Sequence, residues 1–411
     1  LTDVTGVQTC ALPILPFDFR ADFNKLQQDF DKTLFGGPTI YSLYEAGLKN
    51  NIPVTYLYEE NQFMWGYGKN QLRGRSTTFH TDGIKDTEFT MYKDMVGEFL
   101  DMCGLPTPKG KNCFSEEEIV EEALSLGFPV VVKPVAGHKG QGVTTGIESE
   151  EEVRKAFKNI LKSAEEAGAT FEGALVQQQI YGTDHRLLSV NGKFAAALER
   201  VPAFVIGNGV DTIEKLIEVE NAKEIRLDNA RSPLAKIKVD ETLIDFLTLQ
   251  GLNLQSVPQN EQRIELRRVA NISAGGVSIN VTPNMHPDNI QLVEDIAGFF
   301  NVKCLGIDVL AKDISKSWKE GNFGIIEINA GPGVFMHLAP AYGGSSNIPK
   351  LILESHCGKI GTGRIPIIAM NKGSSLMATA FYEILRVIKR DVYLSALTDD
   401  GVHFNNRVFY N

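Results

Sequence analysis

The segment Phe323–Gly333, "FGIIEINAGPG", combines an apolar run with two polar residues that a buried strand rarely carries. Residues two apart in a strand face the same side, so Glu327 and Asn329 are expected to point together. Upstream, "GIDVL" at Gly306–Leu310 sets Asp308 in a second apolar strand. Two carboxylates and an amide oxygen are hard ligands suited to Mg²⁺ beside nucleotide phosphates. The two strands predict a magnesium site, and the alternative is a polar pair on an edge strand or a helix cap.

The segment Phe128–Thr144, "FPVVVKPVAGHKGQGVT", runs from an apolar strand into a glycine-rich loop. Its valine run predicts a buried strand, and Lys133 stands at the end of that strand. Glycines let backbone N–H groups surround phosphate oxygens, and a lysine neutralises the phosphate charge. An ordinary turn with a surface lysine would give the same pattern. The loop residues that fit phosphate binding are Lys139, Gly140 and Gly142.

The segment Leu175–Lys193, "LVQQQIYGTDHRLLSVNGK", has the pattern of a strand, a turn and a second strand. It gathers Gln177, Asp184 and Arg186. A carboxylate there could bind ribose hydroxyls, and an arginine could bind a phosphate or a carboxylate bidentately. Surface hairpins often have this composition, so the segment alone does not indicate a ligand.

Strand and helix signals alternate along the chain and favour the α/β fold class, with α+β subdomains. Ser115–Glu118 and Ser149–Glu152 are capping boxes that predict helix starts. The apolar spacing of Glu88–Cys103 predicts one further helix. The Gly- and Arg-rich stretch Gly66–Gly83 predicts a turn or linker, and the more polar Ile206–Leu252 predicts an inserted lid.

Composition limits the classes of partner. The 411 residues leave room for two or three domains, and the net charge of −10 argues against broad binding of nucleic acid or of an anionic membrane. No apolar run approaches the roughly 20 residues of a membrane helix. The five cysteines lack CxxC spacing and the seven histidines lack metal-ligand spacing. We therefore expect reduced thiols, and structural or exposed histidines, in a cytoplasmic protein.

A lysine with a glycine loop, a Gln/Asp hairpin and two acidic strands follow one another in an order that resembles the ATP-grasp carboxylate–amine ligases. From about Phe35 to the C-terminus the chain further resembles the cyanophycin synthetase branch of that family. The segments that carry this resemblance include "GYGKNQLRGR", "GTDHRLLSVNGK", "LRRVANISAGG" and "GIDVLAKDISK". The resemblance implies an ATP-grasp fold that holds ATP and two Mg²⁺ ions between its subdomains.

The resemblance also implies nucleotide and metal contacts. It suggests that Gln177 meets the adenine amino group and Asp184 the ribose. The remaining residues that it assigns to ATP are Lys93, Lys133, Lys139, Gly140 and Gly142. The residues that it assigns to the metal are Asp308, Glu327 and Asn329.

A last group of residues is implied to act on the substrates. The catalytic set is Arg186, Arg200 and Lys133. The segments that line the acceptor side include the "NISAGG" loop, with Asn271, Ser273, Gly275 and Gly276.

"GRIPI" at Gly363–Ile367 resembles the start of the Mur ligase-like domain of the same branch. Where that domain has a phosphate-loop lysine and a metal-binding hydroxyl, this chain has Leu376 and Met377, which can replace neither. The predicted divisions are a non-native leader (1–14), a partial N-terminal α/β domain (15–85), the ATP-grasp domain (86–360) and a truncated Rossmann-like remnant (361–411).

By resemblance, the expected activity is ATP-dependent ligation of an amine to a carboxylate through an acyl phosphate. The expected partners are aspartate and a peptide or cyanophycin-like polymer, acted on by a homo-oligomer. Two alternatives stay open: a catalytically decayed relic that binds nucleotide or polymer, and a ligase for another amino acid or dipeptide. The relic is favoured by the changed phosphate loop and by three departures from the family pattern, at Tyr92, Gly97 and Gln177; the intact metal set opposes it.

Overall fold

The computed structural model describes residues 38–57, 59–135, 142–166, 168–226, 234–270, 272–321, 323–357, 363–364, 368, 375–388, 395–398, 401–404 and 407–410. The chain divides into two compact units, Leu1–Arg364 and Ile365–Asn411. The predicted leader, most of the glycine loop (with Lys139 and Gly140) and Asn271 lie outside the described residues.

The first described element is helix α2 (Pro38–Lys49), which is followed by a small antiparallel sheet. The sheet order is β1-β2-β3-β4, and the bounds are β1 (Val54–Leu57), β2 (Gln62–Trp65), β3 (Leu72–Arg75) and β4 (Thr78–Phe79). Leu43 of the helix packs with Phe63, Trp65 and Leu72 of the sheet, all of them buried. This apolar contact joins the helix to the sheet.

The predicted linker at Gly66–Gly83 is wrong, because β3 and β4 lie within it. Glycine weakens a strand pattern, yet Gly74 is required here, since a Cβ would lie 2.1 Å from the carbonyl oxygen of Thr78. The close approach of the β3 and β4 backbones therefore explains Gly74, a residue type that the sequence pattern assigns to a turn.

The single helix predicted over Glu88–Cys103 is two helices, α3 (Ile84–Phe89) and α4 (Lys93–Met102). Tyr92 between them is extended, with φ −97° and ψ 93°, which interrupts the helical backbone. The apolar periodicity continues across this break and hides it. As a result, Lys93 stands at the first turn of α4 instead of in mid-helix.

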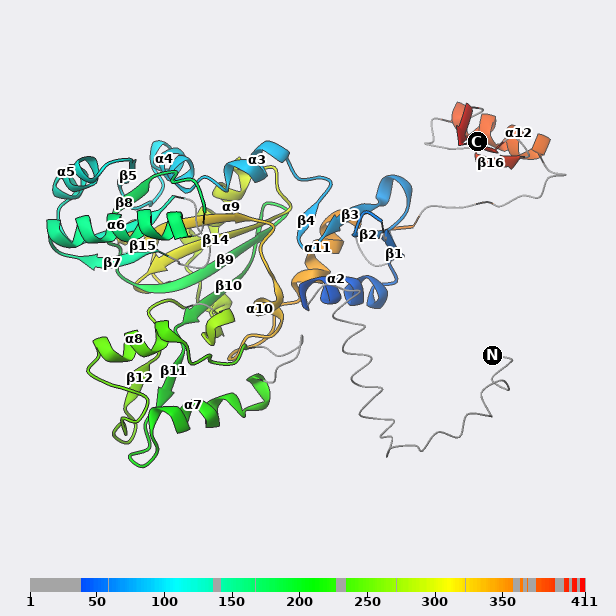
Figure 1. Ribbon diagram of the computed structural model, residues 1–411. Coiled ribbons are helices and arrows are strands. Elements are labelled where there is room, and N and C mark those ends of the chain that lie inside the picture. Colours follow the sequence, from blue (N-terminus) through cyan, green and yellow to red (C-terminus); the bar gives the residue numbers. More distant parts are fainter. Residues whose placement is uncertain are drawn as a thin grey trace, which may run out of the picture. The chain divides into compact units, whose positions relative to one another are not determined.

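A four-stranded sheet with two helices on one face forms the next layer (Figure 1). Both predicted capping boxes are confirmed: Ser115 Oγ accepts from the N–H of Glu118, and Ser149 Oγ accepts from that of Glu152. The sheet order is β5-β8-β6-β7. The bounds are β5 (Gly110–Cys113), α5 (Glu116–Leu126), β6 (Val130–Pro134), β7 (Thr144–Ile147), α6 (Glu150–Glu166) and β8 (Ala174–Gln178).

The largest sheet has five antiparallel strands in the order β13-β10-β9-β14-β15. Its strands are β9 (Thr183–Val190), β10 (Lys193–Val201), β13 (Val277–Asn280), β14 (Cys304–Ala311) and β15 (Phe323–Ala330). Helix α9 (Pro287–Phe299) packs on one face, where Leu187, Ile307 and Ile296 are buried together. On the other face, Leu188 and Cys304 join the apolar core of α2 and α11 (Ile348–Cys357).

The segment predicted as a lid lies within the first unit and has an apolar core of its own, which includes Val205, Leu216 and Leu247. Its elements are β11 (Phe204–Ile206), α7 (Ile213–Asn221), the 3₁₀ turn η2 (Glu224–Arg226), α8 (Glu241–Leu249) and β12 (Arg263–Glu265). The shorter 3₁₀ turns elsewhere are η1 (Gly68–Asn70), η3 (Ile272–Ala274), η4 (Thr282–Asn284) and η5 (Trp318–Glu320).

The second unit contains α12 (Ser375–Val387) and a three-stranded sheet of β16 (Ser395–Thr398), β17 (Gly401–Phe404) and β18 (Arg407–Tyr410). Leu376 and Met377, the two residues that differ from a phosphate loop, lie in the first turn of α12 and are exposed. Among all the helices described, none has the length and apolar character needed to cross a membrane.

Replacing Gly74 with alanine should lower the free energy of unfolding by about 1–3 kcal/mol, because the new methyl group overlaps the backbone of Thr78. Gly298 on α9 is the matched control, since a Cβ there meets no atom within 4 Å and alanine favours the helix. Thermal and urea denaturation of both variants would measure the difference. Equal loss of stability in the two variants would contradict the assigned β3–β4 contact.

Candidate active site

One face of the five-stranded sheet collects the charged residues. Asp308 of β14 lies directly opposite Arg186 of β9 on one side and Glu327 of β15 on the other. Directly opposed residues of antiparallel strands point to the same face. Asn329 follows Glu327 by two positions and pairs with Gly306. The register therefore brings the three predicted metal ligands to the same face as Arg186.

Both carboxylate oxygens of Asp308 are engaged by arginine. The Nε of Arg186 donates to Oδ1 and its Nη2 to Oδ2, the latter at 3.1 Å. Nη2 of Arg200, from β10, lies 3.1 Å from the same Oδ2. Burial opposes the charge of Asp308, but the two guanidinium groups more than offset that cost and lower the pKa of the carboxyl. Asp308 is therefore a buried carboxylate that stays ionised.

Asp184 completes this cluster, because Nε of Arg200 donates to its Oδ1 at 3.0 Å. Burial raises the pKa of Asp184, and the nearby charge of Arg200 offsets this only in part. Although burial opposes the charge of Arg200, Asp308 and Asp184 raise the pKa of that guanidinium. We call the four residues Asp184, Arg186, Arg200 and Asp308 the charge cluster.

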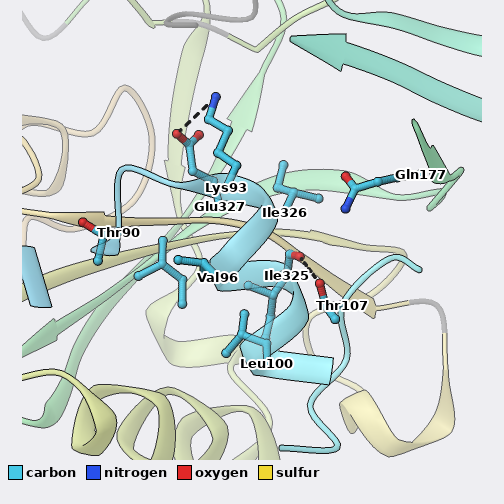
Figure 2. A pocket seen from close by; sticks show the side chains of 11 residues that line it. Thr90, Lys93, Val96, Leu100, Thr107, Gln177, Ile325, Ile326 and Glu327 are labelled. Carbon is cyan, nitrogen blue, oxygen red and sulfur yellow. Dashed lines mark hydrogen bonds and ion pairs between the residues drawn. The ribbon is translucent and has the colours of Figure 1, made fainter. Parts of the chain in front are cut away.

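Two lysines approach the Glu327 side of the same face. Nζ of Lys93 lies 3.6 Å from Oε1 of Glu327, and the two side chains point toward one another in Figure 2. Desolvation, with the added repulsion of Lys93 and despite the attraction of Glu327, lowers the pKa of Lys133 to about 8. The two predicted ATP lysines and one predicted metal ligand thus interact, although they come from α4, β6 and β15.

A narrow crevice runs between α4, β8 and β15 (Figure 2). Gln177, the predicted adenine contact, lines this crevice together with Lys93 and Glu327. Its side chain is buried, and its Nε2 donates to the carbonyl of Pro108 at 3.3 Å. This bond orients the amide and leaves Oε1 as the atom that could accept from an adenine amino group.

The two predicted loops are only partly described. Gly142 has φ +72°, and a Cβ there would lie 3.3 Å from the ring of Pro134, just beyond Lys133. The "NISAGG" loop includes η3, with Ser273, and leads through Gly275 (φ +94°) and Gly276 into β13. There Ser278 is the register partner of Arg200, so this loop leads to the charge cluster.

The donor set fits a hard cation. The two carboxylates supply oxygen ligands, and Asn329 would add its amide oxygen Oδ1, since the Nδ2 group, which is buried without a hydrogen-bond partner, can only donate. Within the described ranges, no group of three or more His, Cys, Asp and Glu side chains could hold a metal. The predicted set has only two carboxylates, and the Asp308 carboxylate is turned to the arginines. Metal binding at this position would therefore require Asp308 to share or exchange its arginine bonds.

Two residues of this region were not predicted from the sequence. Gly306 lets Arg186 lie across β14, since a Cβ there would be 3.1 Å from Nη1 of Arg186 and 2.9 Å from Cβ of Pro332. His337, in the short helix α10 (Phe335–Leu338), is buried beside the charge cluster. The only sequence signal for either is its nearness to an acidic strand.

A domain model described as "ATP-grasp domain" matches residues 84–257. Cyanophycin synthetases of Crocosphaera subtropica and Synechocystis sp. are 35% and 36% identical to the chain, over 86% and 81% of its length. Residues 84–257 are thus similar to an ATP-grasp domain, and the chain is similar to cyanophycin synthetase over most of its length. It spans only 40% and 38% of the length of those two relatives.

Glutathione-forming proteins share the same fold. A glutathione biosynthesis bifunctional protein of Desulfotalea psychrophila is 32% identical over 64% of this chain and 33% of its own. The crystal structure of a bifunctional glutathione synthetase from Pasteurella multocida superposes with a TM-score of 0.61 and 24% identity, covering 82% of this chain and 46% of that one. The predicted α/β class with an ATP-grasp fold is confirmed.

Asp308→Asn should destabilise the metal-free protein by about 3 kcal/mol, because it leaves the buried guanidinium of Arg186 without its carboxylate and that of Arg200 with Asp184 alone. Glu327→Gln is the matched control: its side chain is 35% exposed and lies 3.6 Å from Lys93, so the loss should stay within about 1 kcal/mol. Urea denaturation in the presence of a chelator measures both. Similar losses would show that Asp308 is not the central carboxylate of the charge cluster.

Proposed function

We propose that this protein is an ATP-dependent carboxylate–amine ligase that activates its acid substrate as an acyl phosphate. The observation that carries the proposal is the shared sheet face, on which Asp308 and Glu327 are opposed and Asn329 follows. Two lysines approach the same face beside Glu327. Carboxylates with cations on both sides suit a reaction that moves phosphoryl charge.

The nucleotide would lie beside Lys93, Lys133 and Gln177. In this arrangement Gln177 accepts from the adenine amino group, Asp184 takes the ribose, and Lys93 and Lys133 neutralise the phosphates. The glycine loop with Lys139, Gly140 and Gly142 would cover those phosphates with backbone N–H groups. Mg²⁺ held by Asp308, Glu327 and Asn329 would supply further neutralisation of phosphate charge.

The chemistry needs no side-chain nucleophile. A substrate carboxylate oxygen attacks the γ-phosphorus, the bond to the β-phosphate oxygen breaks, and ADP leaves. The amine lone pair then attacks the acyl carbon, inorganic phosphate departs, and the amine nitrogen loses its proton. Arg186 and Arg200 are well suited to hold the acyl phosphate, and Lys133 to stabilise the charge on the transferred group. The loop with Asn271, Ser273, Gly275 and Gly276 would border the acceptor.

The homology supports aspartate as the amine and a peptide or cyanophycin-like polymer as the acid, by analogy with the aspartate-adding half of cyanophycin synthetase. We further propose that the enzyme acts in the cytoplasm as a homo-oligomer. A relative that makes glutathione leaves open a ligase for another amino acid or dipeptide. The decayed nucleotide-binding relic is the non-enzymatic alternative. The observation in its favour is that Arg186 donates to both carboxylate oxygens of Asp308, which a metal would need.

The direct test is phosphate release from Mg-ATP by the purified chain with a cyanophycin primer and aspartate. The expected result is turnover that requires both substrates. In Glu327→Ala, turnover should fall at least about 100-fold, because a residue beside the transferred phosphoryl group is lost.

Isothermal titration with the non-hydrolysable analogue AMPPNP and Mg²⁺ separates the remaining outcomes. Binding without turnover would favour either the ligase for another amino acid or dipeptide or the nucleotide-binding relic. Absence of nucleotide binding would overturn the ligase proposal. The Lys111→Ala variant is a control, since that lysine pairs with Glu122 on the surface and takes no part in the proposed site.

Nucleotide affinity should depend on pH through Lys133, whose pKa is lowered to about 8. Below pH 8 the ammonium is already charged and binds phosphate directly. Above pH 8 binding must first take up a proton, so the affinity should fall by up to about tenfold per pH unit. In Lys133→Arg the cation stays charged, and this dependence should disappear. Calorimetry between pH 7 and 9.5 measures both profiles, and a flat wild-type profile would contradict the assignment.

A further inference from the structure

His337 is a buried histidine with no hydrogen-bond partner. Its exposed fraction is 1%, and neither Nδ1 nor Nε2 has a partner within the described part of the chain. Buried polar side-chain atoms are nearly always hydrogen-bonded, because leaving them unpaired costs their full desolvation. An unpaired imidazole in the core therefore suggests a partner that arrives in another state of the protein.

The surroundings of His337 define its protonation state. Helix α10 contacts β10, the strand that carries Arg200. Burial, followed by the charges of Arg186 and Arg200, lowers the pKa of the imidazole to about 3. The ring is neutral throughout the physiological range, so one nitrogen donates and the other offers a lone pair. A neutral ring can accept an N–H from a guanidinium, whereas an imidazolium could not.

Arg186 is one of the two guanidinium groups whose charge acts on this ring. Its bonds to Asp308 occupy Nε and Nη2. Nη1 lies at Gly306 close to Pro332, which belongs to the segment that leads into α10. That segment is fixed in turn, because Thr77 Oγ1 donates to the carbonyl of Pro332 at 2.6 Å.

Arg186 loses part of its hydrogen bonding if Asp308 becomes a metal ligand. A carboxylate oxygen that coordinates Mg²⁺ has less electron density to offer to a guanidinium N–H. Arg200 would retain its bond to Asp184, at 3.0 Å, but Asp308 is the only carboxylate that pairs with Arg186 in the described structure. A buried guanidinium that loses its acceptor is unfavourable unless another acceptor is near.

We propose that His337 is a positioning residue, whose neutral ring accepts a hydrogen bond from Arg186 when Asp308 coordinates the Mg²⁺ of the bound nucleotide. The proposal rests on the ligase function proposed above and adds a residue to it. His337 thereby holds the guanidinium of Arg186 toward the acyl phosphate, so that this side chain does not move with Asp308. In the metal-free protein the ring of His337 is unpaired, and it can therefore accept from Arg186 when Asp308 binds the metal.

Nuclear magnetic resonance of the histidine rings tests the exchange directly. The full-length protein, labelled with ¹⁵N, is measured with AMPPNP plus Mg²⁺ and with AMPPNP plus a chelator. The ring signals of His337 are assigned by their loss in His337→Gln. We expect the unprotonated ring nitrogen to shift as it accepts a hydrogen bond, and only when Mg²⁺ is present. An unchanged His337 signal, with nucleotide binding verified by calorimetry, would overturn the proposal but leave the ligase function intact.

Metal affinity provides the second readout, with Mn²⁺ as the probe for electron paramagnetic resonance in the presence of AMPPNP. His337→Leu removes the acceptor and should weaken Mn²⁺ binding about tenfold, because Asp308 can then coordinate the metal only by leaving Arg186 without an acceptor; tenfold is the lower end of the effects seen for residues that support a metal site without binding the ion. His337→Gln keeps a side-chain acceptor and should stay within about threefold. A merely structural role would change melting temperature without separating the two variants in Mn²⁺ affinity. Equal Mn²⁺ affinities would overturn the proposal, and absence of nucleotide binding in the wild type would overturn it together with the ligase function.

Discussion

Four charged side chains on one sheet face, two of them buried and two half-buried, constrain the rest of this structure. Asp308, Arg186, Arg200 and Asp184 can remain ionised away from water only because each lies opposite a charge of the other sign. That pairing fixes the registers of β14 against β9 and of β9 against β10, since a shift by one residue would turn each partner to the opposite face. Gly306 is part of the same constraint, because a side chain there would displace Arg186.

The sheet face that carries this cluster is divided in two along its strands. At one end Leu188, Val190 and Cys304 pack into the apolar core of α2 and α11. At the other end the same alternation of side chains presents Arg186 and Asp308. The apolar end stabilises the strands and thereby holds the polar end in place. The opposite face of the sheet is covered by α9 and is apolar.

Local elements followed from local patterns. The capping boxes at Ser115 and Ser149 and the valine strand at Val130–Pro134 could be predicted because a cap or a buried strand depends on a few neighbouring residues. The strands at Gly66–Gly83 are not predicted, because Gly74 has the pattern of a turn residue. It is needed there for the close approach to the backbone of Thr78, and a local sequence pattern does not show that contact. The break before Lys93 is not predicted, because the apolar spacing of a helix continues across Tyr92, whose backbone is extended.

The sequence by itself determined the α/β class, the order of the motifs and the residue types of the candidate site, since side-chain alternation along a strand is a local property. Only the tertiary structure decided which charges are paired. Arg186 and Asp308 are 122 positions apart, and nothing in either segment indicates that Asp308 faces arginine or that His337 lies beside them. The physical reason is that the energy of a buried charge depends on the distance to its partners and on burial, and strand order sets both.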